Sequence, residues 1–246
     1  LRVFPEDLTL MFRPFPTLLA GGLVLSLSAA CASYGARPAA DAHAGHVMTP
    51  AAQAAASVTP PEDILPGDPP ARPELVRQPF STADIEFMQG MIPHHAQALV
   101  MCALAKPNGA SAQLQLLCER MTVSQRDEIA MMRTWLRDRG QHVPRPDATH
   151  HTMKHDGMTH DMLMPGMLTE AELAELKAAR GRDWDRLFLI GMIKHHQGAI
   201  DMVEKLFASF GAAQDDDVYQ FAADVQADQT AEIDRMQQML AALGGG

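Results

Sequence analysis

The segment Asp84-Ile-Glu-Phe-Met-Gln-Gly-Met-Ile-Pro-His-His-Ala-Gln-Ala-Leu-Val-Met101 recurs as Asp185-Arg-Leu-Phe-Leu-Ile-Gly-Met-Ile-Lys-His-His-Gln-Gly-Ala-Ile-Asp-Met202. The two copies align without a gap and share the spacing of Asp, Phe, Gly, Met, Ile, the paired His and the last Met. A second related segment follows each copy, in which Gln125, Glu128, Ile129, Met132 and Leu136 correspond to Gln229, Glu232, Ile233, Met236 and Leu240. The sequence therefore contains an internal repeat of a two-segment unit.

Both segments of the unit have the periodicity of amphipathic helices. Between Asp84 and Cys102, apolar residues and histidines recur at steps of three and four residues, so they form one stripe of a helix. Ser81 is a suitable N-cap for this helix. Pro93 lies inside the pattern and should kink the helix or remove one hydrogen bond, whereas the second copy has Lys194 at the same place.

The lengths of the connections predict how the helices are arranged. Four helices of about 25 residues, joined within each unit by a short turn, predict two antiparallel hairpins that pack as a bundle. A long connection over residues 141–168 joins the units, and Thr169-Glu-Ala-Glu172 is a capping box that opens a short helix before the second unit. We therefore expect an all-α fold, a four-helix bundle made from a duplicated antiparallel helical hairpin.

The residues before the repeat divide into a targeting segment and a linker. Residues 1–31 contain an uncharged run from Thr17 to Ala30, which is shorter than a typical transmembrane helix. The run ends in small residues before Cys31 and resembles the bacterial lipoprotein signal, in which this cysteine carries the lipid; plain signal cleavage is the alternative. Residues 32–79 indicate a disordered tether to the bundle domain of residues 80–246. We expect an exported, membrane-anchored lipoprotein that faces the periplasm or the cell exterior.

Composition narrows the function mainly by exclusion. The chain of 246 residues has a formal net charge of −10, which argues against a nucleic-acid partner. It has no Gly-x-Ser-x-Gly, P-loop, dinucleotide-binding or His-Glu-x-x-His pattern, so we expect a protein that is not an enzyme. The 17 methionines and 11 histidines are the unusual feature, and they suggest metal ions as partners.

The chain has three cysteines, and this number fits an exported protein in which one carries lipid and the other two can pair. If Cys31 carries lipid, Cys102 and Cys118 remain as a pair on either side of the turn Pro107-Asn-Gly109. An antiparallel hairpin could bring them together as a disulfide, which we favour outside the cytosol. Two thiolate metal ligands are the alternative.

The duplicated Met-x-x-His-His is the most specific chemical signal. Methionine precedes the two histidines by three and four residues, which puts the side chains on one face of each helix. Adjacent histidines diverge by about 100°, so one should point inward and the other should reach a neighbouring helix. Imidazole suits copper, zinc, iron and nickel, whereas a thioether selects Cu(I); core histidines that are only hydrogen-bonded are the alternative. The candidate ligands are Met91, His94, His95, Met192, His195 and His196.

Polar residues also lie on the apolar stripe of the second helix in each unit. A carboxylate that faces a core is costly unless it is paired, and the histidines of the partner helix are the obvious partners. We therefore expect glutamate to orient the histidines that hold metal, while a polar network without metal is the alternative. These residues are Gln125, Glu128, Gln229 and Glu232.

The long connection is dense in histidine and methionine. It has no sustained amphipathic face, and loops lie at the surface, so core packing does not explain this density. Tracts of this composition suggest weaker capture of several metal ions, with low-complexity drift as the alternative. The residues concerned are His150, His151, Met153, His155, Met158, His160 and Met162.

The pattern resembles the domain-of-unknown-function 305 family over about residues 81–243. The resemblance rests on the duplicated Asp, Phe, Met-x-x-His-His and Ala pattern and on the Gln-x-x-Glu-Ile segments at Gln125 and Gln229. It implies a ferritin-like helical fold, and some members look like periplasmic copper-binding proteins involved in copper resistance. It also implies the paired Met and His residues as ligands, with Met101 and Met202 as further candidates.

A comparison with ferritin-like di-iron sites favours copper over iron. Those sites use Glu-x-x-His, and this chain has Met91 and Met192 in place of the glutamate. Soft sulfur favours copper, Cu(I) above all, although other divalent metals stay open. We expect copper binding, sequestration or delivery in the cell envelope, with a copper-trafficking protein as a candidate partner. A ferritin-like di-metal oxidoreductase and a structural envelope lipoprotein without metal are the alternatives.

Overall fold

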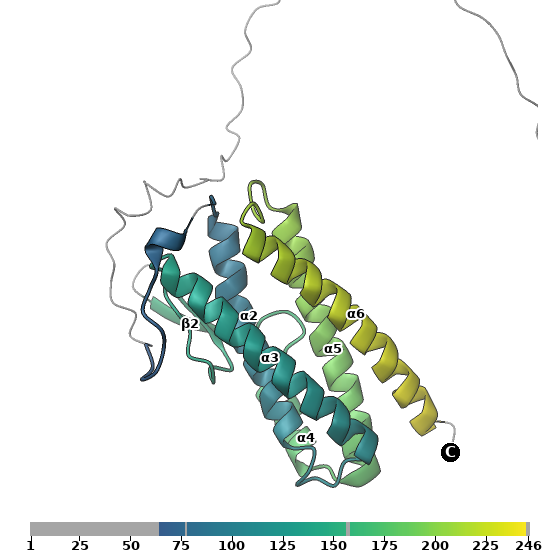
Figure 1. Cartoon of the computed structure of the whole chain (residues 1–246). Coiled ribbons are helices and arrows are strands. Elements are labelled where there is room, and N and C mark those ends of the chain that lie inside the picture. The colour runs from purple at the N-terminus through teal and green to yellow at the C-terminus, as the bar shows by residue number, and fades with distance from the viewer. Residues whose placement is uncertain (1–63, 77, 156–157, 245–246) are drawn as a thin grey trace, which may run out of the picture. The chain divides into compact units, whose positions relative to one another are not determined.

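Four long helices make up most of the described structure (Figure 1). The computed structural model describes residues 64–76, 78–155 and 158–244, and for residues 151–161 it describes the backbone alone. The long helices are α2 (Thr82–Ala103), α3 (Ala112–Asp138), α5 (Gly181–Ala208) and α6 (Asp216–Gly244). The shorter elements are the 3-10 helix η1 (Pro73–Leu75), the helix α4 (Glu170–Ala178) and the strands β1 (His151–His155) and β2 (Met158–Met162).

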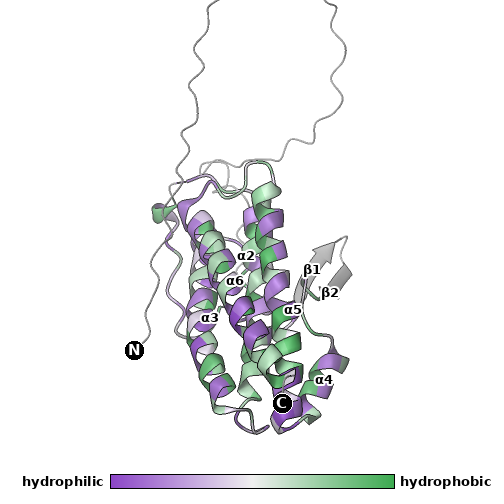
Figure 2. Ribbon diagram, turned by 90° about the vertical axis from the view of Figure 1, so that its right-hand side faces the viewer, coloured by the Kyte–Doolittle hydropathy of each residue, from purple (hydrophilic) through white to green (hydrophobic). Residues whose placement is uncertain are grey.

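The long helices form two antiparallel hairpins. α2 packs along α3, α5 packs along α6, and the hairpins meet through α2 and α5 (Figure 1). Figure 2 shows that each of these helices carries both hydrophobic and hydrophilic residues, as expected for helices with one buried face. The predicted four-helix bundle of a duplicated hairpin is confirmed.

Side chains at the helix starts follow the predicted capping. The Ser81 hydroxyl accepts a hydrogen bond of 3.2 Å from the backbone N–H of Asp84, whose carboxylate accepts one of 2.7 Å from the backbone N–H of Ser81. Thr169 and Glu172 form the same capping box at the start of α4. α2 continues through Pro93, and the cost of this residue is the backbone hydrogen bond that proline cannot donate.

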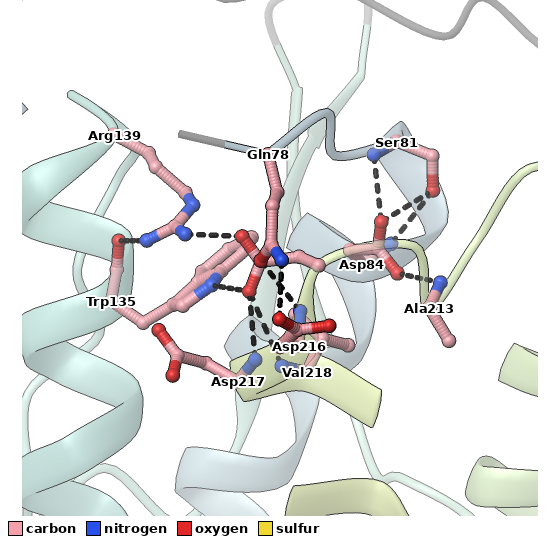
Figure 3. A network of polar contacts seen from close by, with 10 residues as sticks. Gln78, Ser81, Asp84, Trp135, Arg139, Ala213, Asp216, Asp217 and Val218 are labelled. Carbon is pink, nitrogen blue, oxygen red and sulfur yellow. Dashed lines mark hydrogen bonds and ion pairs between the residues drawn. The ribbon is translucent and has the colours of Figure 1, made fainter. Parts of the chain in front are cut away.

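Two buried aspartates connect the hairpins to one another. Asp84 of α2 accepts a hydrogen bond of 2.7 Å from the backbone N–H of Ala213, in the turn between α5 and α6 (Figure 3). Asp185 of α5 accepts one of 3.1 Å from the backbone N–H of Ser111, at the start of α3. Each repeat copy thus uses its aspartate to hold the turn region of the other copy.

The apolar core consists of two clusters that meet at the paired histidines. One cluster contains Met91 and Ala96 of α2 with Ala199 of α5. The other contains Ala98 of α2 with Met192 of α5. On α5 the histidine pair lies between the two clusters, and on α2 it lies just before the change from one cluster to the other, so four polar rings lie close to the boundary of the clusters.

The end of the expected tether packs on the bundle. The sequence indicated an unstructured tether over residues 32–79, but Asp68 forms ion pairs of 2.7 Å with Arg133 and 3.1 Å with Arg137 of α3. Both arginine side chains are only 4% exposed, and buried guanidinium groups need an anion. No local pattern reveals a partner so distant in the chain. Residues 1–63, with the expected signal segment and Cys31, lie outside the described residues.

The connection between the units contains a two-stranded hairpin, although its sequence predicts a loop. The strands β1 and β2 are antiparallel, with the Cα partners His151–Met162, Met153–His160 and His155–Met158. The sequence between them is Asp156-Gly157, a dipeptide favoured in two-residue hairpin turns. The hairpin lies between α3 and α4 and leaves the helical topology of the bundle unchanged. No helix of the described ranges is both long and apolar enough to cross a membrane.

Candidate metal centre

Four histidines meet where α2 packs against α5. His94, His95, His195 and His196 are all 0% exposed. The rings of His94 and His195 face each other across the helix interface, with centroids 3.8 Å apart and planes inclined by 41°. The centroids within the two pairs are 6.3 Å and 6.1 Å apart. In each pair, one histidine faces the other repeat copy and the other reaches a neighbouring helix, as the divergence of adjacent side chains predicts. We call His94 and His195 the inner histidines, His95 and His196 the outer histidines, and all four the histidine layer.

The outer histidines contact glutamates of the neighbouring helices. His95 Nε2 lies 2.6 Å from Glu128 Oε2 of α3, and His196 Nε2 lies 2.6 Å from Glu232 Oε2 of α6. The glutamate side chains are 24% and 28% exposed, so one carboxylate in each half connects a buried ring with the solvent. Burial raises the pKa of Glu128, but the hydrogen bond and charge of His95 outweigh it and hold the pKa below its ordinary value. Both copies contain the predicted glutamate–histidine contact.

The inner histidines contact backbone carbonyl groups. His94 Nε2 lies 3.0 Å from Pro165 O, and His195 Nε2 lies 3.0 Å from His94 O. A carbonyl oxygen can only accept, so Nε2 carries the proton and donates in both rings. Burial, reinforced by His95, lowers the pKa of His94 from 6.5 to about 3, and burial together with His94 lowers the pKa of His195 well below 6.5. Both inner rings are therefore neutral at pH 7, with an electron pair on Nδ1.

In the described part of the chain, the second nitrogen of each of these four rings has no hydrogen-bond partner. Among the described residues, the Nδ1 atoms of all four histidines are buried and unpaired, as are the Oε1 atoms of Gln125 and Gln229. A buried acceptor without a partner is costly, so such atoms normally meet water or a ligand. Histidines that bind metal through one nitrogen commonly donate the other N–H to a carboxylate or a carbonyl. All four rings have the hydrogen bonding that is common for metal-bound imidazole, with Nε2 at an oxygen atom and Nδ1 without a partner among the described residues.

The methionines predicted as ligands lie in the core around the histidine layer. Met91, Met101 and Met192 are 0% exposed, and Met202 is 6% exposed. Met91 belongs to one apolar cluster and its repeat equivalent Met192 to the other. A thioether in such a place can act as apolar filling or as a soft ligand.

The kinds of side chain available limit how a metal ion could be held. In the parts of the chain that the structure describes, no three side chains of His, Cys, Asp and Glu are grouped closely enough to hold a metal ion. A metal ion at the histidine layer would thus need a donor of another kind beside imidazole. Methionine sulfur is the donor that the repeat places one helical turn before each histidine pair, and this combination suits Cu(I).

A cavity of about 280 Å³ lies between α3 and α6. Its lining includes Asp228 and the four polar residues that the sequence placed on the apolar stripes, Gln125, Glu128, Gln229 and Glu232. Burial raises the pKa of Asp228, and the nearby Glu128 and Glu232 raise it further. The negative charge of this cavity favours cations, and its two glutamates connect it to the outer histidines.

The connection between the units also reaches an inner histidine, a contact that the repeat pattern does not predict. Pro165 offers its carbonyl to His94, and the amide of Gln97 exchanges hydrogen bonds of 2.9 Å and 2.7 Å with the backbone of Leu168. Gly198, the repeat equivalent of Gln97, lets the backbone at Pro165 pass directly against α5. The only signal in the sequence is that the two copies differ at this position.

The histidine- and methionine-rich hairpin is described in part. Met162 is 47% exposed, so a thioether stands open to solvent at the end of β2. His150 Nδ1 lies 3.3 Å from the hydroxyl of Thr149. The other predicted ligands of this segment lie outside the described side chains, and they are His151, Met153, His155, Met158 and His160.

Cys102 of α2 and Cys118 of α3 lie next to each other as free, buried thiols. The hydrogen bond with Cys118, followed by burial, raises the pKa of Cys102 well above its ordinary value. A raised pKa disfavours the thiolate that metal ligation requires. The proximity of the thiols fits the expected disulfide, which stays a prediction.

The repeat and the bundle have known relatives. The family model described as "Domain of unknown function (DUF305)" matches residues 84–240, which is more than half of the chain. The chain belongs to the DUF305 family. The match spans both repeat copies and confirms the resemblance found in the sequence. The comparison with curated proteins returned no match.

Solved DUF305 structures have the same architecture. A DUF305 fragment from Deinococcus radiodurans is 28% identical at a TM-score of 0.54, over 71% of this chain and 99% of its own. A candidate secreted DUF305 protein from Streptomyces coelicolor is 26% identical at a TM-score of 0.55, over 66% of this chain and 94% of its own. CopM in a Cu(I)-bound form is 26% identical at a TM-score of 0.50, over 66% of this chain and 98% of its own.

Proposed function

We propose that this DUF305 protein binds copper, as Cu(I), in the layer of four buried histidines. The observation that carries the proposal is the hydrogen bonding of the rings: each Nε2 meets an oxygen atom, and each Nδ1 has no partner among the described residues. The inner rings are neutral, so no proton has to leave them before they donate an electron pair to a metal ion.

Sulfur next to the histidines favours Cu(I) over harder ions. Met91 and Met192 precede the histidine pairs by one helical turn, and thioether ligands select Cu(I). We assign these two methionines and the four histidines of the layer as the ligand set from which the ion is held. Glu128 and Glu232 orient the outer histidines, as carboxylates do around metal-bound imidazole.

The relatives support a soft metal and an exported protein. CopM has a Cu(I)-bound form, and the Streptomyces relative is a candidate secreted protein. By our proposal this chain is exported, carries a lipid at Cys31 and faces the periplasm or the cell exterior. It sequesters copper or delivers it to a copper-trafficking protein, without catalysis. The hairpin of residues 150–162 recruits ions at the surface and supplies the bundle.

A metal titration tests the proposal. Metal-free protein is titrated with Cu(I), and in parallel with Zn(II) and Fe(II), against a competing chelator. We expect tight Cu(I) binding that is lost when His94 and His195 are both replaced by asparagine. Replacing Glu128 and Glu232 with glutamine should weaken binding by about 10- to 100-fold, because the outer histidines lose their orienting anions. The matched control is His142→Asn, at an exposed histidine outside the layer.

The other outcomes separate the alternatives. Cu(I) affinity that is unchanged in the His94 and His195 variant would exclude the layer as the site. Absence of binding to all three metals would favour a structural lipoprotein with a polar core. Bound iron together with oxygen-dependent turnover would favour the di-metal oxidoreductase.

A further inference from the structure

A second cavity, of about 460 Å³, lies on the face of the bundle formed by α2 and α5. The residues that follow β2 contribute one wall, and the lining includes three methionines, Met162, Met164 and Met202. Met162 is 47% exposed, Met164 is half-buried and Met202 is 6% exposed. Three thioethers thus extend from the solvent toward the interior within one cavity.

A glycine of α2 lets two of these methionines approach the same point. A Cβ atom at Gly90 would lie 2.7 Å from Cε of Met164 and 3.3 Å from Cε of Met202. The ends of both side chains therefore meet over the backbone of α2, one from the connection and one from α5. Soft donors that converge from separate elements are what a soft cation such as Cu(I) requires.

The repeat supplies an internal comparison, because Gly191 is the equivalent of Gly90. A Cβ atom at Gly191 would lie 3.1 Å from Leu168 and 3.4 Å from Met101. Met101 corresponds to Met202, but leucine stands where the first copy has a second methionine. Leu168 and Met101 are 3% and 0% exposed. Two methionine side chains thus meet at Gly90, on the side with the cavity, whereas one methionine and one leucine meet at Gly191.

Charged side chains in the lining favour a cation. Glu86 and Asp201 line the cavity together with Lys205, so carboxylates outnumber the cationic group among its lining residues. Negative charge around a cleft raises the local concentration of cations. The cavity therefore combines soft donors with a potential that attracts positive ions.

The cavity adjoins the histidine layer. Pro165 lines the cavity and directly follows Met164, and its carbonyl accepts the hydrogen bond of 3.0 Å from His94. The backbone segment that positions one thioether thus also orients an inner histidine.

We propose that Met164 and Met202, with Met162 at the mouth, form an outer thioether site for the soft monovalent cation Cu(I), separate from the histidine layer. This inference rests on the copper-binding function proposed above and adds a second copper site, which is accessible from the surface. Binding exchanges the ion's solvent ligands for thioether sulfur and involves no change of oxidation state.

Methyl NMR of the metal-free chain, labelled with carbon-13 at the methionine Cε atoms, tests the site. Ag(I) serves as the redox-inert probe, and the resonances are assigned from the variants Met164→Leu and Met202→Leu. We expect the methyl resonances of Met164 and Met202 to shift together on addition of Ag(I). Either variant should weaken this binding by about tenfold or more, because one soft ligand is lost while side-chain volume is nearly conserved.

The control variant is Met132→Leu, since Met132 is buried in the same apolar cluster as Met202 but is not part of the cavity lining. It should leave the Ag(I)-dependent shifts unchanged. The outer site is overturned if the resonances of Met164 and Met202 stay in place while others shift, or if Met132→Leu weakens binding equally.

A parallel Cu(I) titration distinguishes failure of this site from failure of the histidine layer. If the double variant Met164→Leu/Met202→Leu loses about one ion per chain and keeps the binding that depends on His94 and His195, both sites are supported. If it loses no ion, the outer site alone is overturned. If binding depends on the methionines but not on the histidines, the outer site stands and the histidine layer fails.

Discussion

Replacing Gly198 with alanine would disturb the contact between α5 and the connection that passes over it. A Cβ atom at this position would lie 2.0 Å from Pro165 O and 2.3 Å from Pro165 C. Both are backbone atoms, so no side-chain rotation can relieve the overlap. The segment around Pro165 must move away, and the hydrogen bond from His94 is lost with it.

The expected loss of stability is the balance of three effects. Overpacking of an interior costs about 1–3 kcal/mol, and losing the hydrogen bond of a buried ring costs about 1 kcal/mol more. Alanine in a helix interior is more stable than glycine by about 1 kcal/mol. The free energy of unfolding should therefore fall by about 1–3 kcal/mol, which lowers Tm by about 2–12 °C in a chain of this size.

The second repeat copy offers a matched control in the same helix. At Gly191 the nearest atoms are side-chain ends, Leu168 Cδ2 at 3.1 Å and Met101 Cε at 3.4 Å, which can shift by a few tenths of an ångström. Gly191→Ala should thus be neutral or stabilising by up to about 1 kcal/mol. Urea unfolding of the metal-free chain, followed by circular dichroism, measures both variants. Equal stabilities would refute the close approach of the connection to α5.

The free energy of unfolding of the metal-free chain should decrease as the pH falls from about 6.5 toward 3. In the folded chain the pKa of His94 is about 3, so its ring stays neutral, whereas in the unfolded chain the ring takes up a proton near pH 6.5. Urea unfolding at several pH values should show that this free energy decreases less steeply in His94→Asn than in the unchanged chain, and that its pH dependence is the same in both above pH 7. Equal slopes of the two proteins below pH 6.5 would contradict the prediction. Asp185→Ala leaves the backbone N–H of Ser111 without its acceptor and should lower the free energy of unfolding by about 1–3 kcal/mol, measured by thermal unfolding. An unchanged Tm would show that water replaces the carboxylate without loss. Oxidation of the chain should join Cys102 to Cys118, and mass spectrometry that finds only separate alkylated peptides would argue against the disulfide.

The bundle and the outer half of the site could be predicted because they depend on features that recur. Two copies of one helical stripe, with polar residues at equivalent places, are enough to pair Glu128 with His95. The capping residues Ser81 and Thr169 mark helix starts through contacts only three residues long, which a local pattern can reveal.

The inner half of the site could not be predicted, because it depends on a contact between distant segments where the repeat copies differ. Gln97 and Gly198 occupy one repeat position, yet one binds the connection through its amide and the other through its lack of a side chain. The ion pairs of Asp68 with α3 are equally invisible, since their partners lie 65 or more residues away.

The reciprocal contacts of Asp84 and Asp185 mean that neither half of the chain is complete alone. A separate first hairpin would leave the N–H of Ser111 without an acceptor and would uncover the ring of His94. Each aspartate contacts a backbone N–H near the turn of the other copy, so the two copies stabilise each other in a similar way. Two copies in one chain have no need to be identical. A single connection can therefore contact both copies at one repeat position, because Gln97 binds it through an amide and Gly198 makes room for it.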